Sequence, residues 1–398
     1  MRNLCIALGV LGAACGDNAP PEDDAGMEAG RCTAVSPVPG PTYECTSEIV
    51  TVAADVGFFT MDAGLGDLDG DGQLDAVLSQ NTMELAVVWG VWQEQLVDKR
   101  SNLQSVGGVV TIGDLTNDAI DDIVMAASSD HAYVLAGTSD RTLMPLPAFA
   151  WAPTDGVNLV DVNGDGALDL VGALTSRYRS GVLQTVLNDG TGRFAAPVIS
   201  ALGDYVGLYG RVATGDIDCD GNVDLAVPAL NLGPMVNGVE ILLGDGSGHF
   251  TSQRWYEGAS GQPFLADVDG NGSPDLIMQS DMITVAVRRG VGDGSFGEPE
   301  LYGVAQLGAI TVGDVTGDAM PDIVTASIVE VGASQPGGYV HVLENSGGAF
   351  RDAGRWGEMR FWRHVALGDI DADGHNDIIA TDEGGTVQAV HQVCTASD

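Results

Sequence analysis

The sequence predicts an all-β repeat protein, and three observations support this. An acidic segment of nine residues recurs seven times in the 398-residue chain, with its first aspartates 47 to 55 residues apart. Each copy is followed by a short apolar run typical of a strand, such as Leu276-Ile277 or Ile378-Ile379. Gly-rich turns such as Asn188-Asp-Gly190 recur between the copies. A period of this size indicates stacked supersecondary units rather than one large core.

The chemistry of the acidic segment is clearest in the copy that runs from Asp67 to Asp75. Calcium takes roughly six to eight oxygen ligands. Positions 1, 3, 5 and 9 offer side-chain oxygens, position 7 offers its backbone carbonyl, and Gly72 at position 6 permits a sharp turn. An EF-hand would need a Glu at position 12 and flanking helices, whereas Leu78 stands there. We therefore expect a calcium loop between two strands.

Five copies are intact and two are degraded. The expected ligands of the intact loops are Asp67, Asp69, Asp71, Gln73, Asp75, Asp161, Asn163, Asp165, Ala167, Asp169, Asp216, Asp218, Asp220, Asn222, Asp224, Asp267, Asp269, Asn271, Ser273, Asp275, Asp369, Asp371, Asp373, His375 and Asp377. Those of the degraded loops are Asp114, Thr116, Asp118, Ile120, Asp122, Asp314, Thr316, Asp318, Met320 and Asp322. In the degraded loops Ala119 and Ala319 replace the glycine at position 6. The alternative, that an acidic segment is only a solvated turn, applies mainly to these two loops.

These loops resemble the FG-GAP/VCBS repeats of integrin α-subunit propellers and of many bacterial surface proteins. The resemblance covers roughly residues 46–394, and the VCBS branch is closer because the literal Phe-Gly and Gly-Ala-Pro signatures are absent. It implies a seven-bladed β-propeller of four-stranded blades with calcium sites. It also implies a binding role more often than catalysis.

The N-terminus predicts export. Residues 1–14 place one arginine before a short apolar run, as in a secretory signal peptide. Leu11-Gly-Ala-Ala-Cys15 resembles a bacterial lipobox, which implies a lipidated Cys15; ordinary cleavage near Ala14 is the alternative. Residues 15–44 are rich in Pro, Gly and Ala and predict a disordered tether, and residues 45–398 form the propeller. We expect an outer-membrane or cell-surface lipoprotein, or otherwise a periplasmic or secreted protein.

Each blade is expected to follow one plan. An inner strand such as Val109–Ile112 or Ala309–Val312 enters the calcium loop, a second strand leaves it, and a third such as Val239–Leu243 follows. A Gly-rich turn then leads to the fourth strand. The phenylalanines that begin several fourth strands are expected in the core; they are Phe194, Phe250, Phe296 and Phe350.

The ends of the chain predict how the ring closes. After the last loop only two strands remain, and a spare strand, Glu48–Val52, precedes the first loop. If these ends pair, no open edge is left, and Cys45 would lie near Cys394. A Cys45–Cys394 disulfide is the favoured pairing and Cys32–Cys394 is the rival. Cys219 is expected to be a free thiol, and Cys5 to leave with the signal peptide.

The charge limits the class of partner. The net charge is −40, and Lys99 is the only lysine. Binding to nucleic acid or to an anionic membrane through a basic patch is therefore not expected, and a lipid would be the only membrane anchor. No metalloprotease, nucleophile-elbow or phosphate-loop motif occurs, so the sequence does not favour an enzyme.

Aromatic residues gather in the segments expected on the face opposite the calcium loops. The candidates for a ligand-binding face are Trp151, Tyr205, Tyr209, Trp255, Tyr256, Trp356 and Trp362. Their alternative role is packing between blades. The sequence thus predicts a monomeric, calcium-binding adhesion module for a protein or polysaccharide. The alternative is a lyase or hydrolase that acts on polysaccharides at a site in the central channel.

Overall fold

The computed structural model describes most of the chain from Tyr43 onward. The described residues are 43–53, 60–80, 84–92, 96–101, 109–126, 131–147, 149–152, 154, 156–174, 181–202, 210–231, 236–258, 261–304, 306–329, 337–382 and 386–396. The expected signal peptide, Cys15 and nearly all of the expected tether lie outside these residues.

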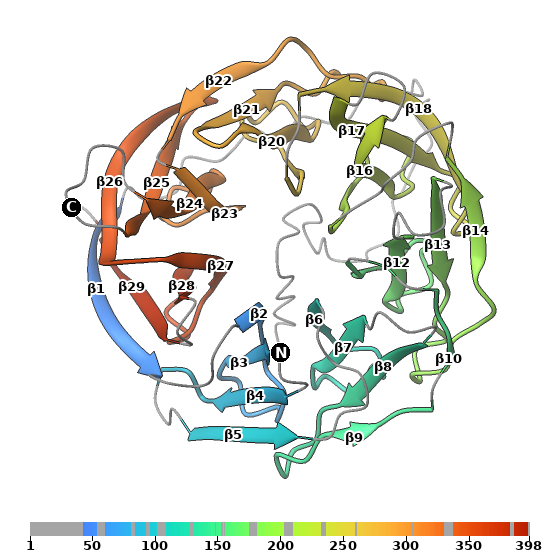
Figure 1. Ribbon diagram of the computed structural model, residues 1–398, viewed down its shortest axis with the longest axis horizontal. Coiled ribbons are helices and arrows are strands. Elements are labelled where there is room, and N and C mark those ends of the chain that lie inside the picture. The colour runs from blue at the N-terminus through green and yellow to red at the C-terminus, as the bar shows by residue number, and fades with distance from the viewer. Residues whose placement is uncertain are drawn as a thin grey trace, which may run out of the picture.

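Seven antiparallel sheets surround a central axis and form a seven-bladed β-propeller (Figure 1). Blade one holds β2 (Thr60–Gly66), β3 (Asp75–Gln80), β4 (Glu84–Trp89) and β5 (Leu96–Ser101). Blade two holds β6 (Val110–Gly113), β7 (Asp122–Ala126), β8 (His131–Ala136), β9 (Met144–Pro145) and β10 (Phe149–Ala150). Blade three holds β11 (Asn158–Val160), β12 (Asp169–Ala173), β13 (Val182–Val186) and β14 (Val198–Ala201). Blade four holds β15 (Ala213–Gly215), β16 (Asp224–Asn231), β17 (Val236–Gly244) and β18 (Phe250–Glu257).

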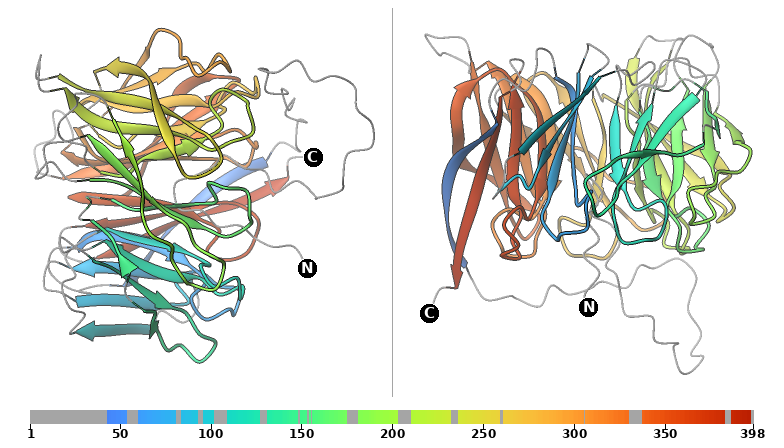
Figure 2. Two further views of the ribbon diagram at one scale, coloured as in Figure 1. Left: turned by 90° about the vertical axis from the view of Figure 1, so that its right-hand side faces the viewer. Right: turned by 90° about the horizontal axis from the view of Figure 1, so that it is seen from below.

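The remaining three blades complete the ring. Blade five holds β19 (Phe264–Ala266), β20 (Asp275–Asp281), β21 (Thr284–Arg288) and β22 (Glu300–Gly303). Blade six holds β23 (Gln306–Gly313), β24 (Asp322–Val329), β25 (Gly338–Ser346) and β26 (Ala349–Arg360). Blade seven holds β27 (Trp362–Gly368), β28 (Asp377–Asp382), β29 (Val387–Ala396) and β1 (Tyr43–Ala53). The edge-on views of Figure 2 show these strands running between the two faces of the ring.

Blade seven closes the ring in the way the sequence predicts. Its sheet order is β1-β29-β28-β27, so the N-terminal strand is the outer strand of a blade that the C-terminus otherwise builds. Tyr43 lies opposite Ala396 and Glu48 lies opposite His391. The strand begins at Tyr43, two residues before the expected start of the propeller.

The outer edge of blade two departs from the four-strand plan. Two short strands, β9 and β10, both pair with β8 in place of one continuous outer strand. Pro145 and Pro147 stand in this edge, and neither has an N–H group to donate to a ladder. The prolines therefore account for the break.

The apolar core lies between the blades. The described residues form seven apolar clusters, each shared by two adjacent blades. Phe250, Phe296 and Phe350 are buried and Phe194 is partly buried against its cluster, which confirms the expected core role of these rings. Where the inner strands converge, a Cβ on Gly66 would lie 2.4 Å from Ile112 Cγ2, so only glycine fits. None of the described residues forms a helix with the length and hydropathy needed to cross a membrane.

Candidate metal centres and the central channel

All seven acidic loops fold in the same way. The backbone N–H at position 6 donates to Oδ2 of the first aspartate at 2.7–3.1 Å in every loop. The N–H at position 7 donates to the side-chain oxygen at position 5, at 2.7–3.0 Å. These bonds fold the chain back on itself around the carboxylate of position 1.

The aspartate at position 9 joins the loop to the rest of its blade. It is buried in every loop, and its Oδ2 accepts the N–H of position 2 at 2.8–3.1 Å. In blades one to six its Oδ1 also accepts an N–H at the start of the third-to-fourth turn, at 2.7–3.0 Å. The carboxylate therefore links both ends of its loop to a neighbouring turn.

The two degraded loops keep the backbone of the intact ones. Ala119 has φ 67° and Ala319 has φ 66°, values that lie in the left-handed region like those of the glycines at position 6. Position 4 is also left-handed, with φ 54° at Asn117, 62° at Cys219 and 62° at Ala372. Sequence reasoning identified the turn at position 6 and missed the one at position 4, where only some loops have glycine.

Four loops gather three carboxylates closely enough to hold a metal ion. The groups are Asp67, Asp69 and Asp71; Asp216, Asp218 and Asp224; Asp267, Asp269 and Asp275; and Asp369, Asp371 and Asp373, with the ligand atoms of each group within 4.8 Å of one another. In the other intact loop Asn163 takes position 3, and its amide donates to Asp165 Oδ2 at 2.9 Å.

The donor set fits a hard cation. Within the loops the side-chain donors are oxygen atoms, which calcium prefers. Asp218 Oδ1, at position 3 of the fourth loop, is buried and accepts no hydrogen bond within the described part of the chain. An oxygen that is buried without a partner is costly, and a bound cation would compensate for it.

Burial shifts the titration of the aspartates at position 9. Desolvation raises the pKa of Asp75, Asp122, Asp224 and Asp322 to about 7, and the N–H groups that donate to them oppose this only in part. The pKa of Asp169 and Asp275 rises to about 6 for the same reason. Without a cation these carboxylates therefore keep their protons to a higher pH than an exposed aspartate does.

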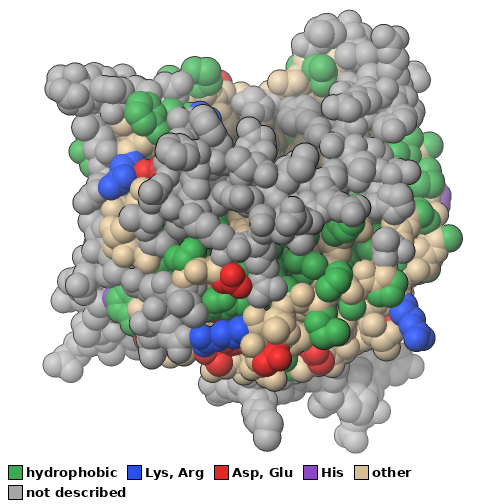
Figure 3. Space-filling model, turned by 60° about the horizontal axis from the view of Figure 1, so that its bottom comes forward, with side chains coloured by type: hydrophobic (Ala, Val, Ile, Leu, Met, Phe, Trp, Pro, Cys, Tyr) green, Lys and Arg blue, Asp and Glu red, His purple; other side chains and the backbone are tan. Residues whose placement is uncertain are grey.

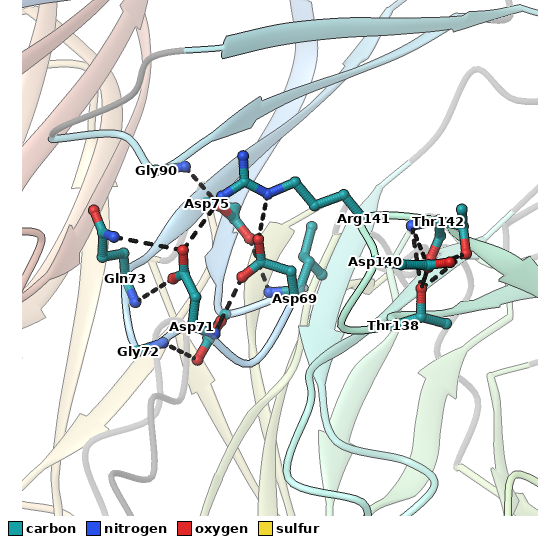
Figure 4. A network of polar contacts seen from close by, with 12 residues as sticks. Asp69, Asp71, Gly72, Gln73, Asp75, Gly90, Thr138, Asp140, Arg141 and Thr142 are labelled. Atoms are coloured by element: carbon teal, nitrogen blue, oxygen red, sulfur yellow. Dashed lines mark hydrogen bonds and ion pairs between the residues drawn. The ribbon is translucent and has the colours of Figure 1, made fainter.

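A basic residue that the sequence did not single out contacts the first loop. Arg141 comes from the turn that follows β8 in the next blade, and its own φ is 63°. Its Nε lies 2.6 Å from Asp69 Oδ2, and its Nη2 lies 3.3 Å from Asp71 Oδ2 (Figure 4). Its Cζ also lies 5.9 Å from the centre of the Trp89 ring. A guanidinium thus shares the carboxylates expected to bind calcium.

The structure confirms one expectation about the cysteines and contradicts another. Cys45 lies directly opposite Cys394 in the β1–β29 ladder, as expected. Directly paired antiparallel residues have Cα atoms about 4.5–5.5 Å apart, which suits a disulfide. The bond itself stays a prediction, because these side chains lie outside the described residues.

The expectation of a free thiol at Cys219 is wrong, because this residue is disulfide-bonded. Its partner is among the cysteines whose side chains are not described.

The expected aromatic binding face is wrong for three of its rings. Trp151, Tyr256 and Trp362 are 1%, 8% and 0% exposed and belong to the clusters between blades. Connectors that pass from one blade to the next lie on the blade interface, so their large rings fill it. Trp255 and Trp356 are partly buried against two of the clusters. Tyr205 and Tyr209 lie outside the described residues.

The central channel contains a polar cluster. Four blades place a polar residue at the same position at or just before the inner strand, five residues before the first aspartate of the acidic loop: Asp62, Arg211, Gln262 and His364. Arg211 crosses between blades to pair with Asp62, and also donates to the carbonyl of Val110. Asp62 accepts the N–H of Val110 at 2.9 Å, and His364 Nδ1 lies 3.8 Å from its other oxygen.

These residues line a cavity. Its volume is about 100 Å³, and Gln262, Thr311 and Phe264 complete the wall around the charged groups. Because the lining residues begin the inner strands, which end at the acidic loops, the cavity lies toward the face away from those loops. Sequence reasoning named the channel as the place for an alternative site but named none of these residues.

Comparisons with known proteins agree with this architecture. Residues 161–227 and 267–325 match the FG-GAP-like repeat family. The fold is similar to that of BBS1N in a crystal structure of its complex with ARL6DN soaked with mercury, with TM-score 0.62 and 14% identity over 87% of this chain and 96% of that one. It is also similar to the WD40 domain of Toxoplasma gondii coronin, with TM-score 0.57 and 9% identity over 93% of this chain and 90% of that one. The protein is therefore a seven-bladed β-propeller that carries FG-GAP-like repeats.

Proposed function

We propose that this protein is an exported binding module that uses its central channel to bind a polysaccharide. An FG-GAP propeller fold suggests a module for binding or adhesion. The observation that carries the proposal is the polar cavity in the channel, with Arg211, Asp62 and His364 drawn from three blades. A site assembled from several blades forms only when the ring is closed, because closure holds those blades in their relative positions.

The acidic loops supply the rigidity that such a site needs, and we propose that they bind Ca²⁺. Their side-chain oxygen donors and the unpartnered Asp218 Oδ1 support this. The loops that begin at Asp114 and Asp314 keep the same fold but offer threonine at position 3, so they bind more weakly. Calcium here stabilises the fold and takes no part in ligand contact.

Export and anchoring through Cys15 complete the proposal. The disulfide at Cys219 supports export, because such bonds persist in oxidising compartments. Glu48 of β1 lies opposite His391, which is beside the last acidic loop, and β1 begins farther along the same direction, at Tyr43 opposite Ala396. β1 therefore begins at the face that carries the acidic loops, so an anchor that precedes β1 would leave the cavity on the opposite side.

The chemistry of the cavity favours an uncharged, hydroxyl-rich group. Arg211 is already paired with Asp62, so the lining offers donors and acceptors with little net charge. The net charge of −40 repels acidic polysaccharides. In the coloured part of the face in Figure 3, Lys and Arg side chains stand as isolated groups and form no continuous basic patch, which supports a partner other than nucleic acid.

A glycan panel tests the proposal. We expect the protein to retain neutral glycans, and the variants His364→Gln and Gln262→Ala to lose that retention while melting like the wild type. Arg254→Gln, on the exposed outer strand β18, is the matched control and should bind normally. Retention that persists in both cavity variants would place the site elsewhere. No retention of any glycan would refute polysaccharide binding and favour a protein ligand.

The same assay addresses a second candidate function. The channel holds a histidine and a carboxylate 3.8 Å apart, which also suits acid–base chemistry on a polysaccharide. Release of shortened products by the wild type, lost in His364→Gln, would favour a lyase or hydrolase. Intact glycan recovered after prolonged incubation would favour a binding module.

A further inference from the structure

The acidic loop of blade seven has a histidine beside it, at a position where the described strands of the other six blades have no imidazole. His391 stands in β29 one residue beyond the Ile378–Val390 pair. The corresponding residues of the other blades are Trp89, Ala136, Leu187, Leu243, Arg289 and Glu344. An imidazole therefore occurs at this position in blade seven alone.

The imidazole is buried between two carboxylates of the loop. His391 is 5% exposed, and its Nδ1 lies 3.0 Å from Oδ1 of Asp377, which is fully buried. Its Nε2 lies 3.3 Å from Asp371 Oδ2. Asp371 is the position 3 ligand of the loop and belongs to two overlapping groups of ligand atoms, one with Asp369 and Asp373 and one with Asp377 and His391.

This arrangement is that of a metal-binding histidine held by a carboxylate. When Asp377 accepts the Nδ1–H, the imidazole is fixed as the tautomer whose Nε2 lone pair is free to coordinate. Nε2 lies 3.3 Å from Oδ2 of Asp371, the residue that also gathers with Asp369 and Asp373. The loop therefore offers nitrogen as well as oxygen at one point.

A nitrogen donor changes which cation is preferred. Calcium favours sites made only of oxygen, whereas imidazole suits first-row transition metals. Loops one, four and five gather carboxylates without an imidazole among their ligand atoms, so they serve as internal references within the described residues.

We propose that Asp369, Asp371, Asp373 and His391 form a mixed nitrogen–oxygen site for a first-row divalent cation such as Mn²⁺ or Zn²⁺, while the other loops take Ca²⁺. Asp377 is the positioning residue that orients the imidazole. The proposal rests on the loops holding cations but not on the glycan ligand of the channel. The competing arrangement is a protonated His391 that pairs with both carboxylates and binds no metal.

Electron paramagnetic resonance with Mn²⁺ tests this on the full chain in excess Ca²⁺. We expect one Mn²⁺ to stay bound, with electron spin echo modulation from one imidazole ¹⁴N. The variant His391→Gln should lose the modulation and bind Mn²⁺ roughly 10-fold or more weakly. His249→Gln, which removes an exposed imidazole outside the acidic loops, is the matched control and should keep the modulation.

The outcomes separate this proposal from the others. Bound Mn²⁺ without nitrogen modulation, or modulation that survives in His391→Gln, would overturn it. Complete displacement of Mn²⁺ by Ca²⁺ would overturn it as well and leave the calcium proposal standing. If the protein binds neither cation, the loops are acidic turns, and the glycan experiment remains a separate question.

A second readout does not depend on the folding of the histidine variant. The Trp92 ring centre lies 4.5 Å from that of His391. Co²⁺ bound at Nε2 should therefore quench Trp92 fluorescence, and the variant Trp92→Phe should remove most of the quenching. Equal quenching in the wild type and in Trp92→Phe would contradict a metal at this site.

Discussion

At the residue scale, the backbone of the acidic loops departs from what most side chains favour. Positions 4 and 6 both take positive φ, and non-glycine residues occupy several of them. A left-handed conformation costs an L-residue roughly 1 kcal/mol or more. The loops at Asp114 and Asp314 therefore keep the shared fold at a cost in backbone energy.

This cost predicts that two substitutions to glycine stabilise the protein. Ala119→Gly and Ala319→Gly should each raise the free energy of unfolding by about 0.5–1 kcal/mol, because glycine adopts positive φ freely. Denaturant melts in the presence of a chelator would measure this. The reverse change, Gly72→Ala, should lower stability by about 1 kcal/mol, since no atom lies within 4 Å of the added Cβ and only the backbone resists. Stability that falls in both glycine variants would refute the argument.

Arg141 stabilises the first loop when no cation is bound, and it lowers the affinity of that loop for calcium. Its guanidinium contacts Asp69 and Asp71 and offsets their charge when no cation is bound. The variant Arg141→Gln should lower the chelated protein's stability by about 0.5–1 kcal/mol and raise the affinity of the first loop for calcium. Terbium luminescence sensitised by the nearby Trp89 would report that affinity. An unchanged terbium affinity, matched to the control Arg254→Gln, would show that Arg141 does not compete.

At the element scale, the seam of the ring is the β1–β29 ladder. Strand pattern alone predicted it, because one blade lacked a strand and the chain had one to spare. The register then set Cys45 against Cys394 without any knowledge of the side chains. Ring closure and this register depend on the number of strands and on residue spacing along the chain, so both can be predicted from the sequence.

The seam predicts the effect of removing its cysteines. The double variant Cys45→Ser, Cys394→Ser should lose about 3–5 kcal/mol of stability by the chain-entropy model, because the bond would close a very long loop. Peptide mapping by mass spectrometry under non-reducing conditions would identify the partners directly. A Cys394 linked to Cys32 would refute the pairing.

Other features were beyond sequence reasoning because they depend on contacts between blades or between paired strands. Trp151 and Trp362 look like exposed connector residues until the neighbouring blade covers them. Arg141 reaches the first loop across a blade boundary, from a turn 72 residues away in sequence. His391 contacts the last loop within its own blade, through the pairing that places β29 beside β28. The disulfide at Cys219 joins residues that no local pattern relates.

At the scale of the whole molecule, the buried aspartates couple stability to pH. Their pKa is raised from 3.8 to about 6 or 7 in the folded protein, so between about pH 4 and pH 7 the folded state binds more protons than the unfolded state. The stability of the chelated protein should therefore fall as pH rises through that window. Calcium, which favours the ionised form, should reverse this trend. Thermal melts at pH 5 and pH 7.5 with and without calcium would measure both, and a chelated protein more stable at pH 7.5 would contradict the assignment.

The same logic predicts a large effect of calcium at neutral pH. Elemental analysis should find five to seven divalent ions per chain, and chelation should lower the melting temperature markedly. At free calcium 100-fold above a site's Kd, each site adds about 2.7 kcal/mol. If the protein contains no metal and its melting temperature is the same with and without a chelator, the loops are only acidic turns.

The closure of blade seven also fixes the order in which the molecule can be completed during synthesis. Tyr43 leaves the ribosome before every other described residue, yet it lies opposite Ala396, the last of them. The first strand must therefore wait, unpaired, until the entire ring has been made. A chain interrupted before Val387 would expose two open sheet edges at once, and open edges invite pairing with other chains. Incomplete chains are thus prone to aggregate, and a chaperone would have to shield β1 for almost the whole time that the chain is being made.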